Sequence, residues 1–150
     1  MGEIEDLYQD LILDHSRTPR NFKKLEKYTQ SAEGFNPLCG DKVTIYTQCE
    51  GDVLKEVSFQ GSGCAISKAS ASILTTVIKN KKLDEIKNLF EKFHHMVTEG
   101  SGSQEDFKDL GKLSAFAGVK EFPIRVKCAT LPWHTLKAAL ESKREVISTE

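Results

Sequence analysis

The sequence has no apolar run that approaches the length of a membrane-spanning helix, and its start, Met1–Asp6, lacks the basic and apolar segments of a signal peptide. It also lacks an excess of either charge. The formal net charge of −1 gives no electrostatic support for nucleic-acid binding. These absences predict a cytoplasmic protein with no nucleic-acid partner and no membrane partner. In that reducing compartment, cysteines are expected to be thiols or metal ligands rather than disulfides.

The sequence has four cysteines but no C-x-x-C pair, which is the usual preformed half of a structural zinc site. Three of them, Cys39, Cys64 and Cys128, lie beside glycines or beside a predicted helix start. They are separated by 25 residues (64 − 39) and by 64 residues (128 − 64). A site collected over such distances needs the whole fold to position it. The spacing therefore suits a functional site better than one that only holds a small domain together.

The periodicity of apolar residues predicts one α+β domain spanning residues 1–150. Residues 42–49 and 53–60 alternate with a period of two, and Gly51-Asp52 between them suits a hairpin turn. A third short strand is expected near residues 30–35. Helical spacing is expected over residues 4–15, 64–78, 83–97 and 110–116, and from Pro132 onward, with a linker at residues 99–103. We therefore expect a small three-stranded antiparallel sheet with helices packed on one face.

Two of the cysteines are expected near helix starts, where unpaired amide groups favour an anion. Cys64 begins one predicted helix, and Lys68 lies one turn further on. Cys128 is expected close to the start of another helix, flanked by Arg125 and Lys127. These surroundings favour the thiolate form, which is the form that binds metals and attacks electrophiles.

The third cysteine lies in a loop. Gly40 can adopt a positive φ, which would let Cys39 and Asp41 point toward one centre. Together with Cys64 and Cys128 they make three thiolates and one carboxylate, a set that fits tetrahedral zinc. Thiolates also suit iron–sulfur clusters, so the residues alone leave both metals open.

Other residues have simpler interpretations. Cys49 falls on the apolar face of its predicted strand, so we expect it to be a core residue. His94 and His95 are expected on the surface of their helix rather than at a metal. Trp133 is expected to pack the last helix against the core.

Three motifs carry a resemblance to the NifU/IscU family of iron–sulfur assembly proteins, and the resemblance extends along nearly the whole chain. Residues 36–41 read Asn-Pro-Leu-Cys-Gly-Asp, and residues 61–67 read Gly-Ser-Gly-Cys-Ala-Ile-Ser. Residues 125–129 read Arg-Val-Lys-Cys-Ala. IscU-type scaffolds have a histidine before the third cysteine and a Leu-Pro-Pro-Val-Lys motif upstream of it. This chain has Lys127 and Phe122-Pro123-Ile124-Arg125 there, and a long stretch over residues 83–116, which is similar to the SufU branch.

The resemblance implies a SufE/NifU-like fold and zinc bound by Cys39, Asp41, Cys64 and Cys128. It implies that Cys39 accepts persulfide sulfur from a SufS-type cysteine desulfurase, and that the sulfur passes to downstream iron–sulfur assembly machinery. The protein would then act as a zinc-dependent sulfurtransferase that is co-substrate and activator of the desulfurase. The alternative is an IscU-type scaffold that assembles a transient [2Fe–2S] cluster, or holds iron, on the same ligands.

Overall fold

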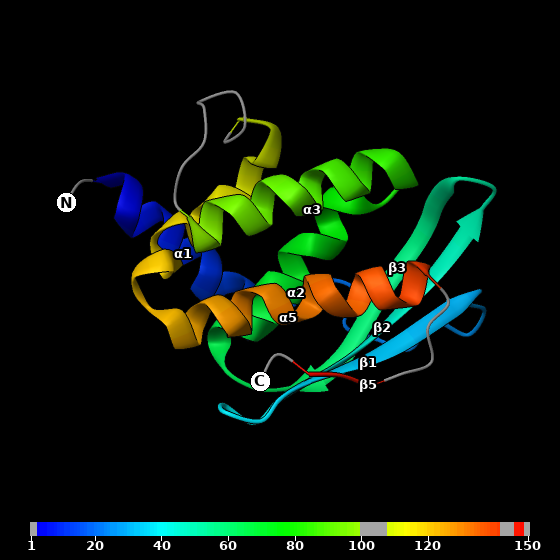
Figure 1. The fold of residues 1–150 in the computed structure, drawn as a ribbon, viewed down its shortest axis with the longest axis horizontal. Coiled ribbons are helices and arrows are strands. Elements are labelled where there is room, and N and C mark those ends of the chain that lie inside the picture. The colour runs from blue at the N-terminus through cyan, green and yellow to red at the C-terminus, as the bar shows by residue number, and fades with distance from the viewer. Residues whose placement is uncertain (1–2, 100–107, 142–145, 149–150) are drawn as a thin grey trace.

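The computed structural model describes the backbone of residues 3–99, 108–141 and 146–148, and the side chains of residues 9–99 and 108–141 (Figure 1). The helical elements are α1 (Glu3–Arg17), α2 (Ala65–Ile78), α3 (Leu83–Thr98), the 3₁₀ helix η1 (Gly111–Glu121) and α5 (Pro123–Leu140). The strands are β1 (Gln30–Asn36), β2 (Asp41–Glu50), β3 (Val53–Ser62), β4 (Lys81–Lys82) and β5 (Val146–Ser148). In this part of the chain no helix is both long and apolar enough to span a membrane.

The sheet has the strand order β4-β3-β2-β1-β5. The three long strands β1, β2 and β3 pair antiparallel, as the sequence predicts, and the α+β class is confirmed. The sheet is larger than expected, because β4 adds to β3 and β5 pairs parallel with β1. These added strands have two and three residues. Strands so short show no period of two, so the sequence pattern did not reveal them.

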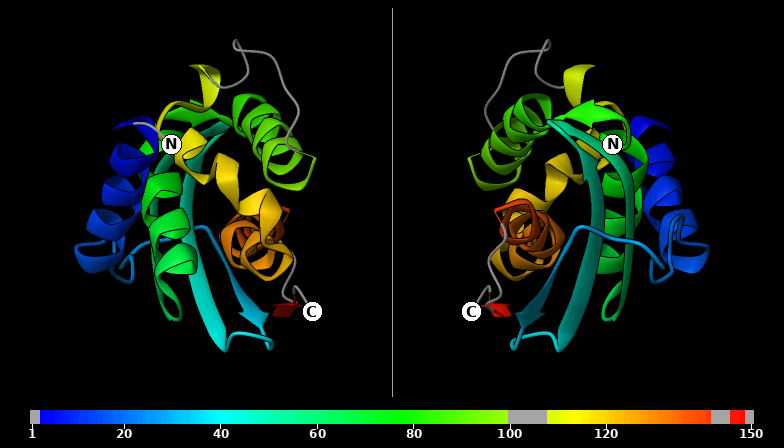
Figure 2. Two further views of the ribbon diagram at one scale, coloured as in Figure 1. Left: turned by 90° about the vertical axis from the view of Figure 1, so that its left-hand side faces the viewer. Right: turned by 90° about the vertical axis from the view of Figure 1, so that its right-hand side faces the viewer.

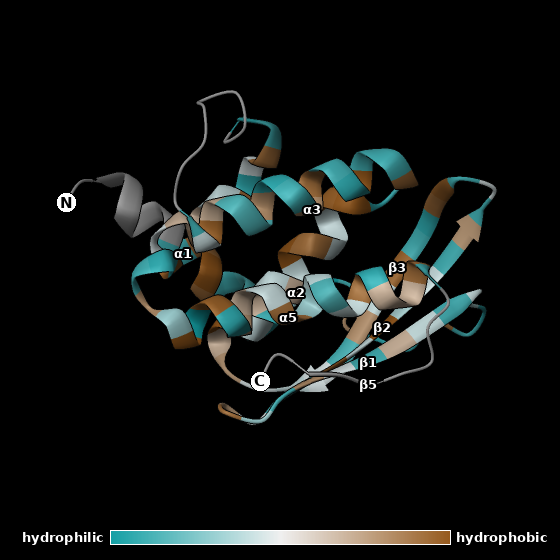
Figure 3. Ribbon diagram, viewed as in Figure 1, coloured by the Kyte–Doolittle hydropathy of each residue, from teal (hydrophilic) through white to brown (hydrophobic). Residues whose placement is uncertain are grey.

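The helices pack against one face of the sheet, and α5 lies along β1 and β2 (Figures 1 and 2). Gly34 permits this close approach, since a Cβ on that residue would meet the Thr135 hydroxyl at 2.0 Å. Trp133 is fully buried and stacks on Phe93 with ring centroids 5.1 Å apart, which confirms that it packs the last helix against the core. In Figure 3, apolar and polar stretches alternate along α3, as expected for a helix with one buried side.

A β-bulge changes the phase of β3. The sequence pattern placed Val53 with Val57 on the buried face, but Leu54 is the fully buried residue and Val53 is half-buried. The cause is a shift of register between Gln48 and Cys49 in the pairing with β2. An extra residue in one strand turns all later side chains to the other face, and the alternation alone does not show where such a residue lies.

The last helix begins earlier than predicted. We expected Pro132 in its first turn, but α5 starts at Pro123 and Pro132 lies inside it. Proline removes one backbone donor within a helix. Near this proline, the Ser70 hydroxyl of α2 donates to the Ala129 carbonyl at 2.6 Å and so ties α5 to α2. Cys128 is therefore in the second turn of α5 rather than close to its start.

The region after α3 agrees with the sequence in part. A short helix expected over residues 110–116 is present as the 3₁₀ helix η1, which extends to Glu121. The predicted linker at residues 99–103 lies, apart from Glu99, outside the described residues. Lys92 of α3 forms an ion pair with Asp109 at 2.5 Å, joining the two segments that flank it.

Candidate metal centre

The register of the sheet gathers the predicted site residues at one end. Asn36 pairs with Asp41, so these two residues close the β1–β2 hairpin, and Lys42 pairs with Ser62 at the end of β3. The chain leaves β3 there and enters α2 through Cys64, which brings that residue beside Asp41. The first turns of α5 lie at the same end of the sheet (Figure 1).

Cys39 lies in the tight turn that joins β1 and β2. The turn spans residues 37–40 and is closed by a hydrogen bond from the Gly40 N–H to the Asn36 carbonyl at 2.8 Å. Gly40 has a φ of +73°, which confirms the conformation expected of it. Leu38 is 59% exposed and Cys39 is half-buried, so the thiol lies at the boundary between solvent and the interior.

The structure brings all four predicted residues into one neighbourhood. The donor atoms of Cys39, Asp41 and Cys128 lie within 4.8 Å of one another, and the Cys39 and Cys128 sulfurs are 3.5 Å apart. Cys64 lies at the border of this group and meets it through Asp41, with its Sγ 3.8 Å from Asp41 Oδ2. Asp41 is fully buried and accepts the Cys64 N–H at 2.8 Å through its other oxygen.

Two of these separations approach the edge length of a tetrahedral zinc site, while Cys64 lies outside the group of three whose donor atoms are all within 4.8 Å of one another. A zinc–sulfur bond of about 2.3 Å places neighbouring sulfurs of a tetrahedron about 3.7 Å apart. The Cys39–Cys128 and Cys64–Asp41 separations of 3.5 and 3.8 Å are close to that value and correspond to opposite edges of such a tetrahedron. The donor set, three sulfurs and one carboxylate oxygen, suits zinc or iron and not a hard ion such as magnesium.

Gly63 packs directly against the Asp41 carboxyl group. A Cβ at this position would lie 2.5 Å from Asp41 Oδ1, closer than real Cβ contacts. The glycine before Cys64 is therefore required so that the β3–α2 connection can pass beside the carboxylate and donate the Cys64 N–H to it.

The two inner thiols have opposite acidities. Cys64 caps α2 by accepting the Ser67 N–H. Hydrogen bonds from the Cys128 thiol and from this amide lower the pKa of Cys64 to about 6. Burial and the charge of Asp41 act in the opposite direction but are smaller in total. The hydrogen bond from the Cys128 thiol, with burial and the nearby Asp41, strongly raises the pKa of Cys128. In the metal-free site these opposite shifts favour Cys64 over Cys128 as the thiolate.

Two expectations about these thiols change. A favourable helix start was predicted for Cys128, and this is wrong, since that residue is buried in the second turn of α5. Lys68, one turn further along α2, was predicted to favour the Cys64 thiolate. Its ammonium group lies over the Phe22 ring at 5.9 Å, and the causes that lower the Cys64 pKa are hydrogen bonds instead.

Asn36 is a site residue to which the sequence analysis gave no role. It is fully buried, and its Nδ2 lies 3.5 Å from Asp41 Oδ2 and 3.7 Å from Cys128 Sγ. Its Oδ1 accepts the Leu38 N–H at 3.2 Å. A polar residue at an inward position of β1, directly before Pro37, was the available indication.

The remaining candidates lie elsewhere. Cys49 is half-buried against the core, and burial raises its pKa. His94 stacks on Phe90, and His95 pairs with Glu99 at 3.0 Å, so both are exposed residues of α3 as predicted.

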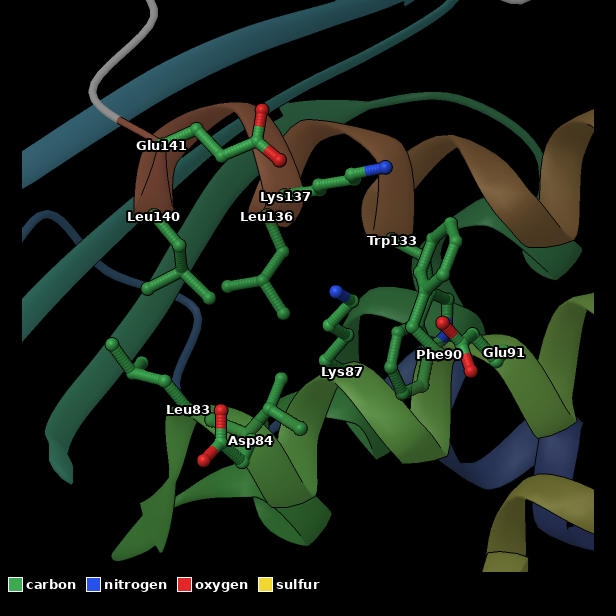
Figure 4. Close-up of a pocket in the computed structure, with 11 residues that line it drawn as sticks. Leu83, Asp84, Lys87, Phe90, Glu91, Trp133, Leu136, Lys137, Leu140 and Glu141 are labelled. Carbon is green, nitrogen blue, oxygen red and sulfur yellow. The ribbon is translucent and has the colours of Figure 1, made fainter. Parts of the chain in front are cut away.

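A cavity of about 300 Å³ lies between α3 and α5, away from the cysteines (Figure 4). Its floor is apolar, with Leu83, Phe90 and Leu136 among its lining residues, while lysines and carboxylates alternate at its rim. It has none of the thiols, so it does not compete with the cysteine site as the location of the chemistry.

Comparison with known proteins identifies the family. The model of the NifU-like N-terminal domain matches residues 7–129. The chain belongs to this family. Among curated members, the zinc-dependent sulfurtransferase SufU of Bacillus subtilis (strain 168) is 37% identical and covers 91% of this chain and 90% of its own length. The iron–sulfur cluster assembly scaffold protein IscU of Streptococcus pyogenes serotype M1 is 33% identical, over 94% of this chain and 87% of its own.

A solved structure of this family has the same fold. It is a candidate iron–sulfur cluster assembly scaffold protein for the SUF system, FiSufU, from Fervidobacterium islandicum AW-1. It matches with a TM-score of 0.82 and 37% identity, over 93% of this chain and 99% of that one. The resemblance stated from the motifs is confirmed, and with it membership of a family of iron–sulfur cluster assembly proteins.

Proposed function

We propose that this protein is a cytoplasmic zinc-dependent sulfurtransferase of the SufU type. It accepts persulfide sulfur from a SufS-type cysteine desulfurase at Cys39 and passes it to downstream iron–sulfur assembly machinery. One observation carries the proposal: Cys39 lies on a tight, exposed turn, and its sulfur is 3.5 Å from that of the buried Cys128. The similarity to a relative named as a zinc-dependent sulfurtransferase supports the same conclusion.

The four donors divide into a fixed part and a part that is able to leave. Asp41 and Cys128 are buried, and Cys64 is held at the start of α2 by its backbone and side-chain hydrogen bonds. Cys39 is the member whose turn faces solvent. Zinc, when bound by these residues, keeps their thiols deprotonated and shields them from oxidation.

The transfer step requires a free Cys39 thiolate. Its sulfur attacks the outer sulfur of the desulfurase persulfide, forming a new S–S bond on Cys39 while the S–S bond of the donor breaks. The electron pair of the broken bond remains on the desulfurase cysteine as a thiolate. No oxidant or reductant is consumed, because one persulfide is exchanged for another.

The second candidate function is a scaffold that assembles a [2Fe–2S] cluster on the same residues. Its support is the three clustered sulfurs and the similarity to relatives named as scaffolds. Lys127 stands where IscU-type scaffolds have a histidine, which favours the transferase. Metal analysis of protein purified without oxygen or chelators separates the two: the transferase holds one zinc and is colourless, whereas the scaffold absorbs visible light.

The test compares two cysteines in one chain. Cys39→Ser is expected to abolish the acceleration of a SufS-type desulfurase, measured as alanine released from cysteine, while the control Cys49→Ser retains it. Mass spectrometry should find the persulfide on the Cys39 peptide. The zinc content of both variants is measured alongside. If Cys39→Ser still accepts sulfur and stimulates the desulfurase, the nucleophile is misassigned.

A further inference from the structure

Asn36 connects the Cys39 turn to the buried donors. On the turn side it makes two hydrogen bonds. Its backbone carbonyl accepts the Gly40 N–H at 2.8 Å, and its side-chain Oδ1 accepts the Leu38 N–H at 3.2 Å. These two amides flank Cys39 in the chain, so Asn36 holds the turn from both sides of the thiol.

On the other side, the amide group of Asn36 faces the donor set. Its Nδ2 lies 3.5 Å from Asp41 Oδ2 and 3.7 Å from Cys128 Sγ. Both atoms are acceptors when their groups are ionised, and an amide donor stabilises them without adding charge. The asparagine amide supplies an acceptor for the turn and a donor for the anionic site on two separate atoms.

Burial shows that this is more than an ordinary turn. Asparagine side chains that bond their own backbone are common in exposed turns, but this one is 0% exposed. Burying an amide is costly unless its polar atoms have partners. The partners of this amide are the turn on one side and the donor set on the other, so a movement of Cys39 that opens the turn also disturbs the contacts of Asn36.

We propose that Asn36 is a positioning residue that latches the Cys39 turn against Asp41 and Cys128 and so limits how readily Cys39 leaves the site. The inference rests on the proposed function, because departure of Cys39 matters only if Cys39 receives sulfur. The latch itself is a property of this chain and is measured without a desulfurase.

The test measures the alkylation rate of each cysteine by iodoacetamide, using peptide mass spectrometry on metal-free and on zinc-loaded protein. Asn36→Leu keeps the branched shape at Cγ and removes both polar functions. It should raise the Cys39 rate about tenfold relative to Cys64 and Cys128, a factor that equals about 1.4 kcal/mol. Thr47→Val is the matched control, since it removes a hydrogen bond of a fully buried residue of β2 far along the strand from the site. It should change none of the ratios.

Asn36→Asp separates the contact with the turn from the contacts with Asp41 and Cys128. It also replaces Asn36→Leu as the test variant if that protein does not fold. It keeps an acceptor for the Leu38 N–H but replaces the donor with a charge. The Cys39 rate should still rise about tenfold, because the turn keeps its acceptor but is no longer tied to Asp41 and Cys128, and cobalt(II) affinity should fall as well. A wild-type Cys39 rate in this variant would overturn the proposal.

Other outcomes are equally decisive. An unchanged Cys39 ratio in Asn36→Leu, an equal rise at all three cysteines, or the same rise in Thr47→Val contradicts a latch. Stimulation of a desulfurase by wild-type protein is measured in parallel. If that stimulation is absent, the proposed function fails while the alkylation ratios still decide the role of Asn36.

Discussion

Substitution of Asp41 separates the structural and metal-binding parts of the site. The side chain is fully buried, and its Oδ1 accepts the Cys64 N–H at 2.8 Å. A hydrogen bond to a charged group contributes about 1.5–3 kcal/mol to stability. For a chain of this size, 1 kcal/mol changes the melting temperature by about 2–4 °C. We therefore expect metal-free Asp41→Ala to melt about 3–12 °C below metal-free wild type.

Zinc adds a separate contribution. A metal that binds only the native state, at a free concentration of one hundred times its Kd, stabilises that state by about 2.7 kcal/mol. This corresponds to a rise of about 5–11 °C in the melting temperature. Wild type should lose this rise on chelation. Asp41→Ala and Asp41→Asn should show little rise, because neither retains the carboxylate.

Asp41→Asn is the matched variant, since its amide oxygen still accepts the Cys64 N–H. Without metal it should melt close to wild type and above Asp41→Ala. Differential scanning calorimetry with zinc and with chelator measures all three proteins. If chelation leaves the wild-type melting temperature unchanged, zinc is not coupled to this fold. If Asp41→Asn retains the full rise with zinc, the carboxylate is not a ligand.

Three further predictions concern the surroundings of the site and the first helix. Gly63→Ala should lower zinc affinity at least tenfold, because the added methyl group displaces the Asp41 carboxylate. Gly118→Ala is the control and should leave the affinity unchanged, since a Cβ there meets open space. Chelator competition measures the zinc affinity of both variants. Burial lowers the pKa of His15 below its usual 6.5. As the pH falls below 6.5, the unfolded chain therefore binds a proton at this histidine before the native state does, and the native state loses stability. The free energy of unfolding from urea titrations should therefore decline more steeply below pH 6.5 in wild type than in His15→Gln, and equal slopes would contradict this. Lys127→Ala should lower zinc affinity more than it lowers the stability of the metal-free protein. Three thiolates and a carboxylate carry more negative charge than Zn²⁺ neutralises, and the cation next to Cys128 in the chain stabilises that excess. Equal losses of affinity and stability would indicate a merely structural role.

Local sequence patterns were enough for the parts of the fold that depend on near neighbours. The alternation in β2 and the turn at Gly51 predicted the central hairpin, and Gly40 has the positive φ expected of it. The start of α2 directly after Cys64 was also predicted correctly. Each of these follows from the conformational preferences of a few adjacent residues.

The position of Cys128 could not be obtained in the same way. Pro132 is a strong local indication of a helix start, yet α5 continues through it, packed against α2 and the sheet and tied to α2 by the Ser70–Ala129 hydrogen bond. The short strands β4 and β5 and the bulge in β3 likewise depend on pairing with other strands. Long-range contacts of this kind leave no periodic pattern.

The sequence by itself determined the family, the α+β class and the set of four residues expected to share a centre. The tertiary structure decided how those residues meet. Sheet register places Asp41 beside Cys64, and the packing of α5 on β1 brings Cys128 to Cys39. It also decided which thiol is acidic, because the pKa of Cys64 depends on a hydrogen bond from Cys128. Residue identity and local spacing determine what a side chain can bind, whereas distance, burial and hydrogen-bond partners exist only once the chain has folded.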